Sequence, residues 1–199
     1  ALLWVPAEMG GFETAIKKGD HKSGEVQGQT RQHARLLGLL GVEQLIVGVN
    51  KMDTVDWSEQ RFNEIKEEMT TMIKSAGFPP KKVPFIPFSG FQGENLVTPT
   101  DKMPWYKGWS ANLNKETVQQ GVTLLDALEK LAKPPKRNVE GKVRIPINGV
   151  YKIKGVGDVI TGRVEQGVIK PNDVVGVCPR GLKNLKIFSV EMHHKSIPA

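Results

Sequence analysis

The sequence feature that most constrains this chain is an unbroken apolar run, Leu45-Ile46-Val47-Gly48-Val49, followed at once by Asn50-Lys51-Met52-Asp53. A strand that is apolar at every residue is covered on both faces, which is typical of a parallel sheet with helices on each side. Polar residues directly after such a strand lie at its carboxyl end, where open α/β sheets bind their ligands. The run therefore predicts a ligand-binding loop at residues 50–53.

The side chains of this loop suit a guanine base. Guanine presents two adjacent donors, the ring N1–H and the 2-amino group, and one carboxylate can accept from both. We expect Asp53 to accept this pair, the Lys51 stem to lie flat against the base, and Asn50 to bond the base and neighbouring loops. Adenine would leave the carboxylate unpaired, which is how such a pocket rejects it. Asn, Asp and Lys are also ordinary loop residues, so a plain polar loop is the alternative.

Strands and helices alternate along the first two thirds of the chain. Apolar residues at threes and fours predict helices over 30–40, 62–76 and 124–131, whereas short apolar runs predict strands at 2–5, 45–49 and 83–88. We expect Gly41 to end the first helix, Asp56 with Glu59 to cap the second, and Thr123 to cap the third. This order predicts an α/β fold with a parallel sheet and helices on both faces.

A second polar loop, Ser89-Gly90-Phe91, directly follows the third predicted strand. The carboxyl ends of parallel strands lie at one edge of the sheet, so this loop is predicted to lie beside residues 50–53. We expect the Ser89 hydroxyl to brace Asp53 or Asn50, and the Gly90 N–H to point at the guanine O6. Residues 92–120 are predicted to be irregular, with aromatic rings at 105–109 that pin them to the domain.

The last third of the chain differs in composition. The run Lys133-Pro134-Pro135-Lys136-Arg137 is typical of a linker, and residues 134–141 are predicted to form it. Beyond it, short apolar runs around 143–147, 157–164, 173–177 and 185–191 alternate with Gly and Pro turns, which predicts antiparallel strands of a β-barrel. Residues 1–132 hold 15 Lys and Arg against 16 Asp and Glu, whereas residues 133–199 hold 13 against 5. The basic last third indicates an anionic partner such as RNA, or simply a solvated basic surface.

Other kinds of site are not supported by the sequence. The single cysteine, Cys178, excludes an internal disulfide framework and fits a reducing compartment. No stretch approaches the length of a membrane span, so we expect a cytoplasmic protein without a membrane partner. His193 and His194 are adjacent, and adjacent strand residues face opposite ways, so no metal site is expected. No Ser-His-Asp or Cys-His grouping is evident either.

The chain resembles the translational GTPases of the elongation factor 1-alpha superfamily. The resemblance rests on 28–34, on 44–53, and on 150–158 with 162–167 and 190–194 in the last third. Within that superfamily, residues 22–27, 155–158 and 163–166 are most similar to the elongation factor-like branch. The resemblance implies that residues 1–133 are the C-terminal part of a GTP-binding domain and residues 142–199 the N-terminal part of a β-barrel domain.

The resemblance also implies a function. It suggests a cytoplasmic protein that carries aminoacyl-tRNA to the ribosomal A site with GTP, hydrolyses GTP to GDP, and is served by a nucleotide-exchange factor. It assigns guanine contacts to the two polar loops, at Asn50, Lys51, Met52, Asp53, Ser89, Gly90 and Phe91. Mg²⁺ is expected in the full-length protein. Termination and ribosome-rescue GTPases share these motifs, and a nucleotide-independent RNA-binding module is a further alternative.

Several parts of such an enzyme are not found in the sequence. No glycine-rich phosphate loop ending in Lys and Ser or Thr precedes Asn50, and no Asp-x-x-Gly loop precedes it either. Asp173-Val174-Val175-Gly176 matches the second pattern by its letters only, because it lies after the base motif in a predicted barrel strand. We therefore expect a fragment that holds half of a nucleotide site, with no catalytic residue and no metal ligand, and that is inactive alone.

Overall fold

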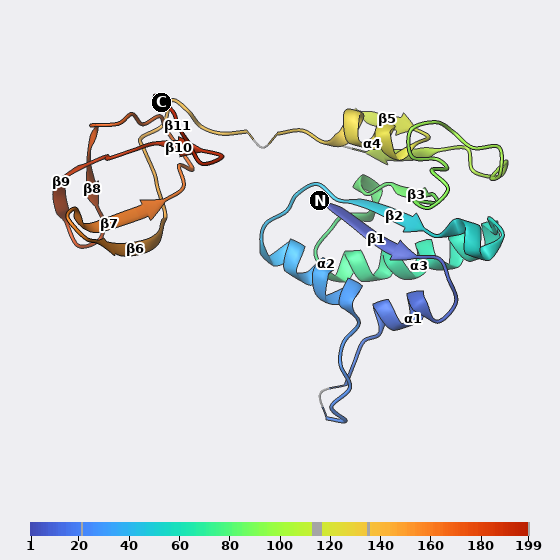
Figure 1. The fold of residues 1–199 in the computed structure, drawn as a ribbon. Helices are drawn as coiled ribbons and strands as arrows, with labels where there is room; N and C mark the ends of the chain where they lie inside the picture. Colours follow the sequence, from blue (N-terminus) through green and yellow to red (C-terminus); the bar gives the residue numbers. More distant parts are fainter. Residues whose placement is uncertain (21, 113–116, 135, 199) are drawn as a thin grey trace. The chain divides into compact units, whose positions relative to one another are not determined.

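The computed structural model describes residues 1–20, 22–112, 117–134 and 136–198, and it divides the chain into two compact units, Ala1–Lys133 and Pro134–Ala199. Pro135 of the expected linker therefore lies outside the described residues. The first unit holds a parallel sheet with helices, and the second holds antiparallel strand pairs (Figure 1). No helix in the described part of the chain is long and apolar enough to cross a membrane.

Among the described residues of the first unit, three parallel strands form a sheet in the order β1 (Leu2–Pro6), β2 (Ile46–Asn50) and β3 (Phe85–Pro87). Trp4 of β1 lies opposite Gly48 of β2, and Gly48 lies opposite Ile86 of β3. Because all three strands run the same way, their carboxyl ends meet at one edge. The predicted α/β class with a parallel sheet is confirmed.

Helices cover both faces of this sheet (Figure 1). On one face lie α1 (Gly11–Ile16), α2 (Gln29–Leu39) and α3 (Glu59–Ser75), and on the other lies α4 (Leu124–Leu131). Val47 and Val49 of β2 pack in the core with α3, whereas Ile46 packs in the second core with α4. Successive residues of β2 thus serve two different cores, which is why the strand is apolar throughout.

Gly48 lets an aromatic ring lie across the central strand. A Cβ at this position would come 2.6 Å from Cε1 of Phe88, a fully buried side chain. The Phe88 ring also meets Trp4 edge-on, with centroids 5.1 Å apart. Phe88 is the last residue before the second polar loop, so this packing fixes the point from which that loop starts.

The caps of the helices follow the sequence in two of three cases. Gly41 takes a φ of 72° just after α2 ends, and the Thr123 hydroxyl accepts from Asp126 N–H at the start of α4, as predicted. The predicted pair of Asp56 and Glu59 is wrong, because Ser58 caps α3 and accepts from Arg61 N–H at 3.2 Å. Ser58 has the extended backbone that a cap requires, whereas Asp56 has a φ of 49°.

The capping box of α4 has a measurable acid–base signature. The backbone N–H groups of Val122 and Thr123 donate to Asp126 Oδ2, and they lower the pKa of that carboxyl from 3.8 to about 2. Because the pKa is lower in the folded state, the stabilisation is full above the unfolded value and is lost as the pH falls through about 2. A carbon-detected NMR titration of Asp126 should therefore show a midpoint near 2. A midpoint at its ordinary value would contradict the box.

The region predicted to be irregular contains a hairpin. β4 (Trp109–Asn112) pairs with β5 (Val118–Gly121), and residues 113–116 of this region lie outside the described residues. The alternation of buried Trp109 and Ala111 with exposed neighbours is the signal of a short strand. Trp105 pins the chain as expected, because its ring packs on Phe62 and its Nε1–H donates to Trp57 O at 2.8 Å.

The described part of the second unit holds three antiparallel pairs: β6 (Ile147–Ile153) with β7 (Gly157–Gly162), β8 (Val174–Val177) with β9 (Leu182–Lys186), and β10 (Glu191–Met192) with β11 (Lys195–Ser196). The predicted antiparallel strands are confirmed, and a barrel that joins them stays a prediction. His193 and His194 lie in the turn between β10 and β11, both with positive φ, and not on a strand as expected.

Candidate functional site

The structure brings the two polar loops together at the carboxyl edge of the sheet, as the strand order predicts. Gly90 N–H donates to Asn50 Oδ1 at 2.9 Å, and Met52 N–H donates to Phe88 O at 3.3 Å. The first bond joins the loop after β3 to the last residue of β2. Residues 50–53 and 89–91 therefore form one surface that is held by hydrogen bonds between the loops.

Asn50 is the hub of this surface. Its Oδ1 also accepts from its neighbour's backbone, Lys51 N–H, at 2.7 Å, and its carbonyl accepts from Ala7 N–H at 2.8 Å. The side chain thus joins the two polar loops, while the backbone joins β2 to the end of β1. The predicted bond from Asn50 to neighbouring loops is confirmed, and a bond to a base stays a prediction.

The chain turns sharply after Asn50. Lys51 has a φ of 62°, in the left-handed region that non-glycine residues seldom adopt, and a short 3-10 helix, η1 (Met52–Val55), follows. The turn is held by Thr54, whose N–H and Oγ1 both donate to Lys51 O, at 3.1 and 2.8 Å. Such strain clusters at ligand sites. The turn leaves Lys51 exposed and buries Met52 in the core, so a contact of Met52 with a ligand would involve its backbone.

Asp53 carries an unpaired oxygen. The residue is half-buried, and its Oδ1 is buried without a hydrogen-bond partner among the described residues. A buried carboxylate oxygen without a donor is costly, and such atoms are rare in native proteins. Met52 N–H and Thr54 N–H, the nearest donors along the chain, are bonded elsewhere. Asp53 is therefore suited to accept from a donor outside the chain, as the two N–H groups of guanine would provide.

The loop at 89–91 differs in detail from the prediction. Ser89 is fully buried, and its hydroxyl accepts from Gln92 N–H at 3.1 Å, so it shapes its own loop and does not brace Asp53 or Asn50. Gly90 N–H bonds Asn50 and does not point away from the chain toward a ligand oxygen. Both expectations were wrong, because the Ser89 hydroxyl closes its own loop and Gly90 N–H bonds Asn50 of the other loop. Phe91 is 94% exposed, which leaves its ring free to stack on a base.

Two contacts of this site were not foreseen from the sequence. Asn95 is fully buried and donates from Nδ2 to Pro87 O at 2.8 Å, which fixes the far end of the second loop. Lys51 Nζ forms an ion pair with Glu8 Oε2 at 2.9 Å. Glu8 lies just after β1, so the rule that ligands bind at the carboxyl ends of strands could have identified it.

Comparison with known proteins identifies a family for the first unit. The elongation factor Tu GTP binding domain matches residues 2–134, a range that spans both polar loops and most of the chain. The chain belongs to this GTP-binding domain family. The resemblance to translational GTPases expected from the sequence is thereby confirmed, and the parallel sheet described above lies within the matched residues.

Members of the wider superfamily resemble the chain along its whole length. Elongation factor 1-alpha-B of Schizosaccharomyces pombe is 49% identical over 199 residues, which is 100% of this chain and 41% of that protein. Elongation factor 1-alpha of Coccidioides immitis is 48% identical, covering 99% of this chain and 40% of that protein. The chain thus spans about two fifths of the length of these curated relatives.

Solved structures also match the chain along almost its whole length. The crystal structure of Sup35 complexed with GDP matches with a TM-score of 0.51 and 29% identity, over 98% of this chain and 43% of that one. Translation elongation factor SelB from Methanococcus maripaludis, in complex with the GTP analogue GppNHp, matches with a TM-score of 0.53 over 100% of this chain and 34% of that one. At 21% identity the second match shows the fold alone.

Proposed function

We propose that this chain carries the guanine-base site of a GTP-dependent translation elongation factor. The observation that best supports this is the unpaired, buried Oδ1 of Asp53 at the edge where loops 50–53 and 89–91 meet. The proposed guanine site comprises both loops. Asn50, Lys51, the backbone of Met52, Asp53 and Phe91 are the candidate contacts with the base, and Ser89 and Gly90 hold the second loop beside them. The names of the curated relatives and the GDP complex of Sup35 agree with it.

The remaining chemistry belongs to the longer protein that we infer from the relatives. In that protein, Mg²⁺ and a phosphate loop would hold the triphosphate, and hydrolysis would give GDP and phosphate. Among the residues that the structure describes, no group of three His, Cys, Asp or Glu could hold a metal ion. We assign base recognition and domain structure to this part of the protein. Residues 1–133 form the C-terminal part of the GTP-binding domain, residues 134–141 a linker, and residues 142–199 the start of a β-barrel.

The proposed partners are aminoacyl-tRNA, the ribosome and a nucleotide-exchange factor, all in the cytoplasm. The basic last third of the chain supports an RNA partner, since Lys and Arg outnumber Asp and Glu by 13 to 5 there. Residues shared with the elongation factor-like branch make that branch the subfamily we expect. A termination or rescue GTPase is the second candidate, and a nucleotide-independent RNA-binding module is the third.

Protection of aminoacyl-tRNA separates these functions. With GTP, the full-length protein should slow spontaneous hydrolysis of the ester bond in aminoacyl-tRNA, and with GDP it should not. Deacylated tRNA should fail to compete. RNA binding that is equal with GTP, with GDP and without nucleotide would favour the binding module, and stimulated release of a nascent peptide without ester protection would favour a termination factor.

A further inference from the structure

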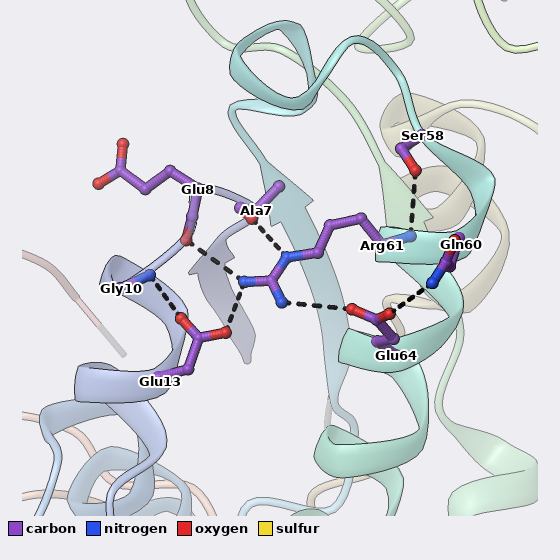
Figure 2. Close-up of polar contacts among 8 residues, drawn as sticks. All are labelled: Ala7, Glu8, Gly10, Glu13, Ser58, Gln60, Arg61 and Glu64. Carbon is purple, nitrogen blue, oxygen red and sulfur yellow. Dashed lines mark hydrogen bonds and ion pairs between the residues drawn. The ribbon is translucent and has the colours of Figure 1, made fainter.

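Arg61 fixes the loop after β1 to the start of α3 (Figure 2). Its side chain is 10% exposed, and its Nε donates to Ala7 O at 2.8 Å. Its Nη2 donates to Glu8 O at 3.4 Å and to Glu13 Oε1 at 2.8 Å. The guanidinium also lies over the Phe12 ring at 5.5 Å. These contacts therefore fix the backbone at residues 7–8 relative to α3, the helix that follows residues 50–53.

Glu8 uses its two ends for different partners. Its carbonyl accepts from Arg61, whereas its carboxylate points away from the guanidinium in Figure 2. That carboxylate reaches Lys51 Nζ at 2.9 Å. Gly11 leaves room for this side chain, because a Cβ there would come 2.8 Å from Glu8 Cγ. Glu8, whose backbone is held by Arg61, thus binds the ammonium of Lys51 in the candidate base site.

We propose that Glu8 is a positioning residue for guanine recognition, which it performs by holding the Lys51 stem across the carboxyl ends of β1 and β2. This inference rests on the proposed function, in which that stem lies against the base. A free lysine stem has many rotamers and loses them when a base packs on it. A stem already held by Glu8 loses fewer, so the ion pair favours binding through preorganisation.

The exposure of the pair argues that its role lies in binding and not in holding the fold. The side chains of Lys51 and Glu8 are 48% and 41% exposed, and exposed ion pairs contribute little to stability. Ala7 links the loop after β1 to the candidate base site independently of Glu8. Its carbonyl accepts from Arg61, and its N–H donates to Asn50 O at 2.8 Å. These backbone hydrogen bonds of Ala7 do not involve the Glu8 side chain. A Glu8 variant therefore tests the ion pair with Lys51 alone.

The test is Glu8→Gln in the full-length protein, with the dissociation constant of GDP measured by calorimetry. We expect GDP binding about two- to fivefold weaker, the range for exposed ion pairs. The difference should vanish between about 0.1 M and about 1 M salt, as the Debye length falls from about 10 to about 3 Å. In a Lys51→Met background, Glu8→Gln should have no further effect, because the pair is already broken.

Glu64→Gln is the matched control. It removes a carboxylate from the same Arg61 cluster, where Glu64 Oε2 lies 3.5 Å from Nη1, but on the other side of the guanidinium from Glu8 in Figure 2. This variant should bind GDP as the wild type does, and both variants should unfold at the wild-type temperature.

Two sets of outcomes distinguish this inference from the proposed function. If the wild type binds GDP but Glu8→Gln binds it equally well or more tightly, the positioning role is refuted and the base site stands. The same follows if Glu8→Gln weakens binding equally in the Lys51→Met background, or only with a lower unfolding temperature. If the wild type does not bind GDP, the proposed function itself fails.

Discussion

Asp53→Asn in the full-length protein is expected to weaken GDP binding at least about a hundredfold, and to favour xanthosine diphosphate. Hydrogen bonds to a charged acceptor contribute roughly 1.5–3 kcal/mol each, and the carboxylate would accept two from guanine. The amide accepts one at most and turns its NH₂ group toward a guanine donor. Xanthine has a carbonyl in place of the 2-amino group, so the same NH₂ gains a partner there. Competition binding with GDP, xanthosine diphosphate and ADP measures this exchange.

Asp56→Asn is the control for this change. Asp56 is exposed three residues further along the chain and has a φ of 49°, a conformation that Asn accepts well. It loses the same charge without touching the loop contacts at Asn50 and Gly90. Its GDP affinity should equal that of the wild type. Equal affinity in the Asp53→Asn protein would refute the role assigned to Asp53.

Arg61→Met should lower the free energy of unfolding of the first unit by about 2–4 kcal/mol, given the usual size of hydrogen bonds to charged groups. The Arg61 side chain is 10% exposed and donates to two backbone carbonyls and two carboxylates. Methionine keeps the packing of the stem but leaves Ala7 O without its donor. Glu13 and Glu64 are about half exposed and return to water, which keeps the cost below the sum of the lost bonds. Native-state hydrogen exchange of the α3 amides measures the loss.

The pKa of Glu13 gives an independent reading of the same variant. Burial raises that pKa, but hydrogen bonds from the backbone and from Arg61 outweigh it and lower the pKa below its ordinary 4.5. The Arg61–Glu13 contribution to stability is therefore present above that value and is lost as the pH falls through the lower folded pKa. In Arg61→Met the pKa of Glu13 should rise toward 4.5.

Arg35→Met is the control for the loss of stability. Arg35 is exposed, so this change should shift the free energy of unfolding by less than about 0.5 kcal/mol. Equal losses in both variants would contradict a specific role for Arg61.

The parts of the fold that were predictable are those set by local patterns. The apolar run of β2 indicates a strand between two cores, and its Val47 and Ile46 do pack in different cores. The order of strands then places residues 50–53 beside 89–91, as the bond from Gly90 to Asn50 shows. These inferences succeed because strand direction and side-chain alternation follow from chain order alone.

The parts that were missed depend on contacts between distant residues. The sequence does not show that Ser58 has the extended backbone of a cap, so Asp56 was a reasonable alternative. Ser89 and Gly90 have donors and acceptors that suit several partners. The folded loop pairs Ser89 with Gln92 and Gly90 with Asn50, which the sequence does not show. The pair of Glu8 and Lys51 joins residues 43 positions apart, which only the assembled sheet brings together.

The central claim is that Asp53 reads the guanine base, and a crystal structure of the full-length protein with GDP tests it most directly. The distances to measure run from the Asp53 carboxylate to guanine N1 and to the 2-amino nitrogen. We predict that both are about 2.7–3.2 Å, the range of N–H···O hydrogen bonds. A base bound elsewhere, or an Asp53 carboxylate paired with a donor of the protein while GDP is bound, would contradict the account.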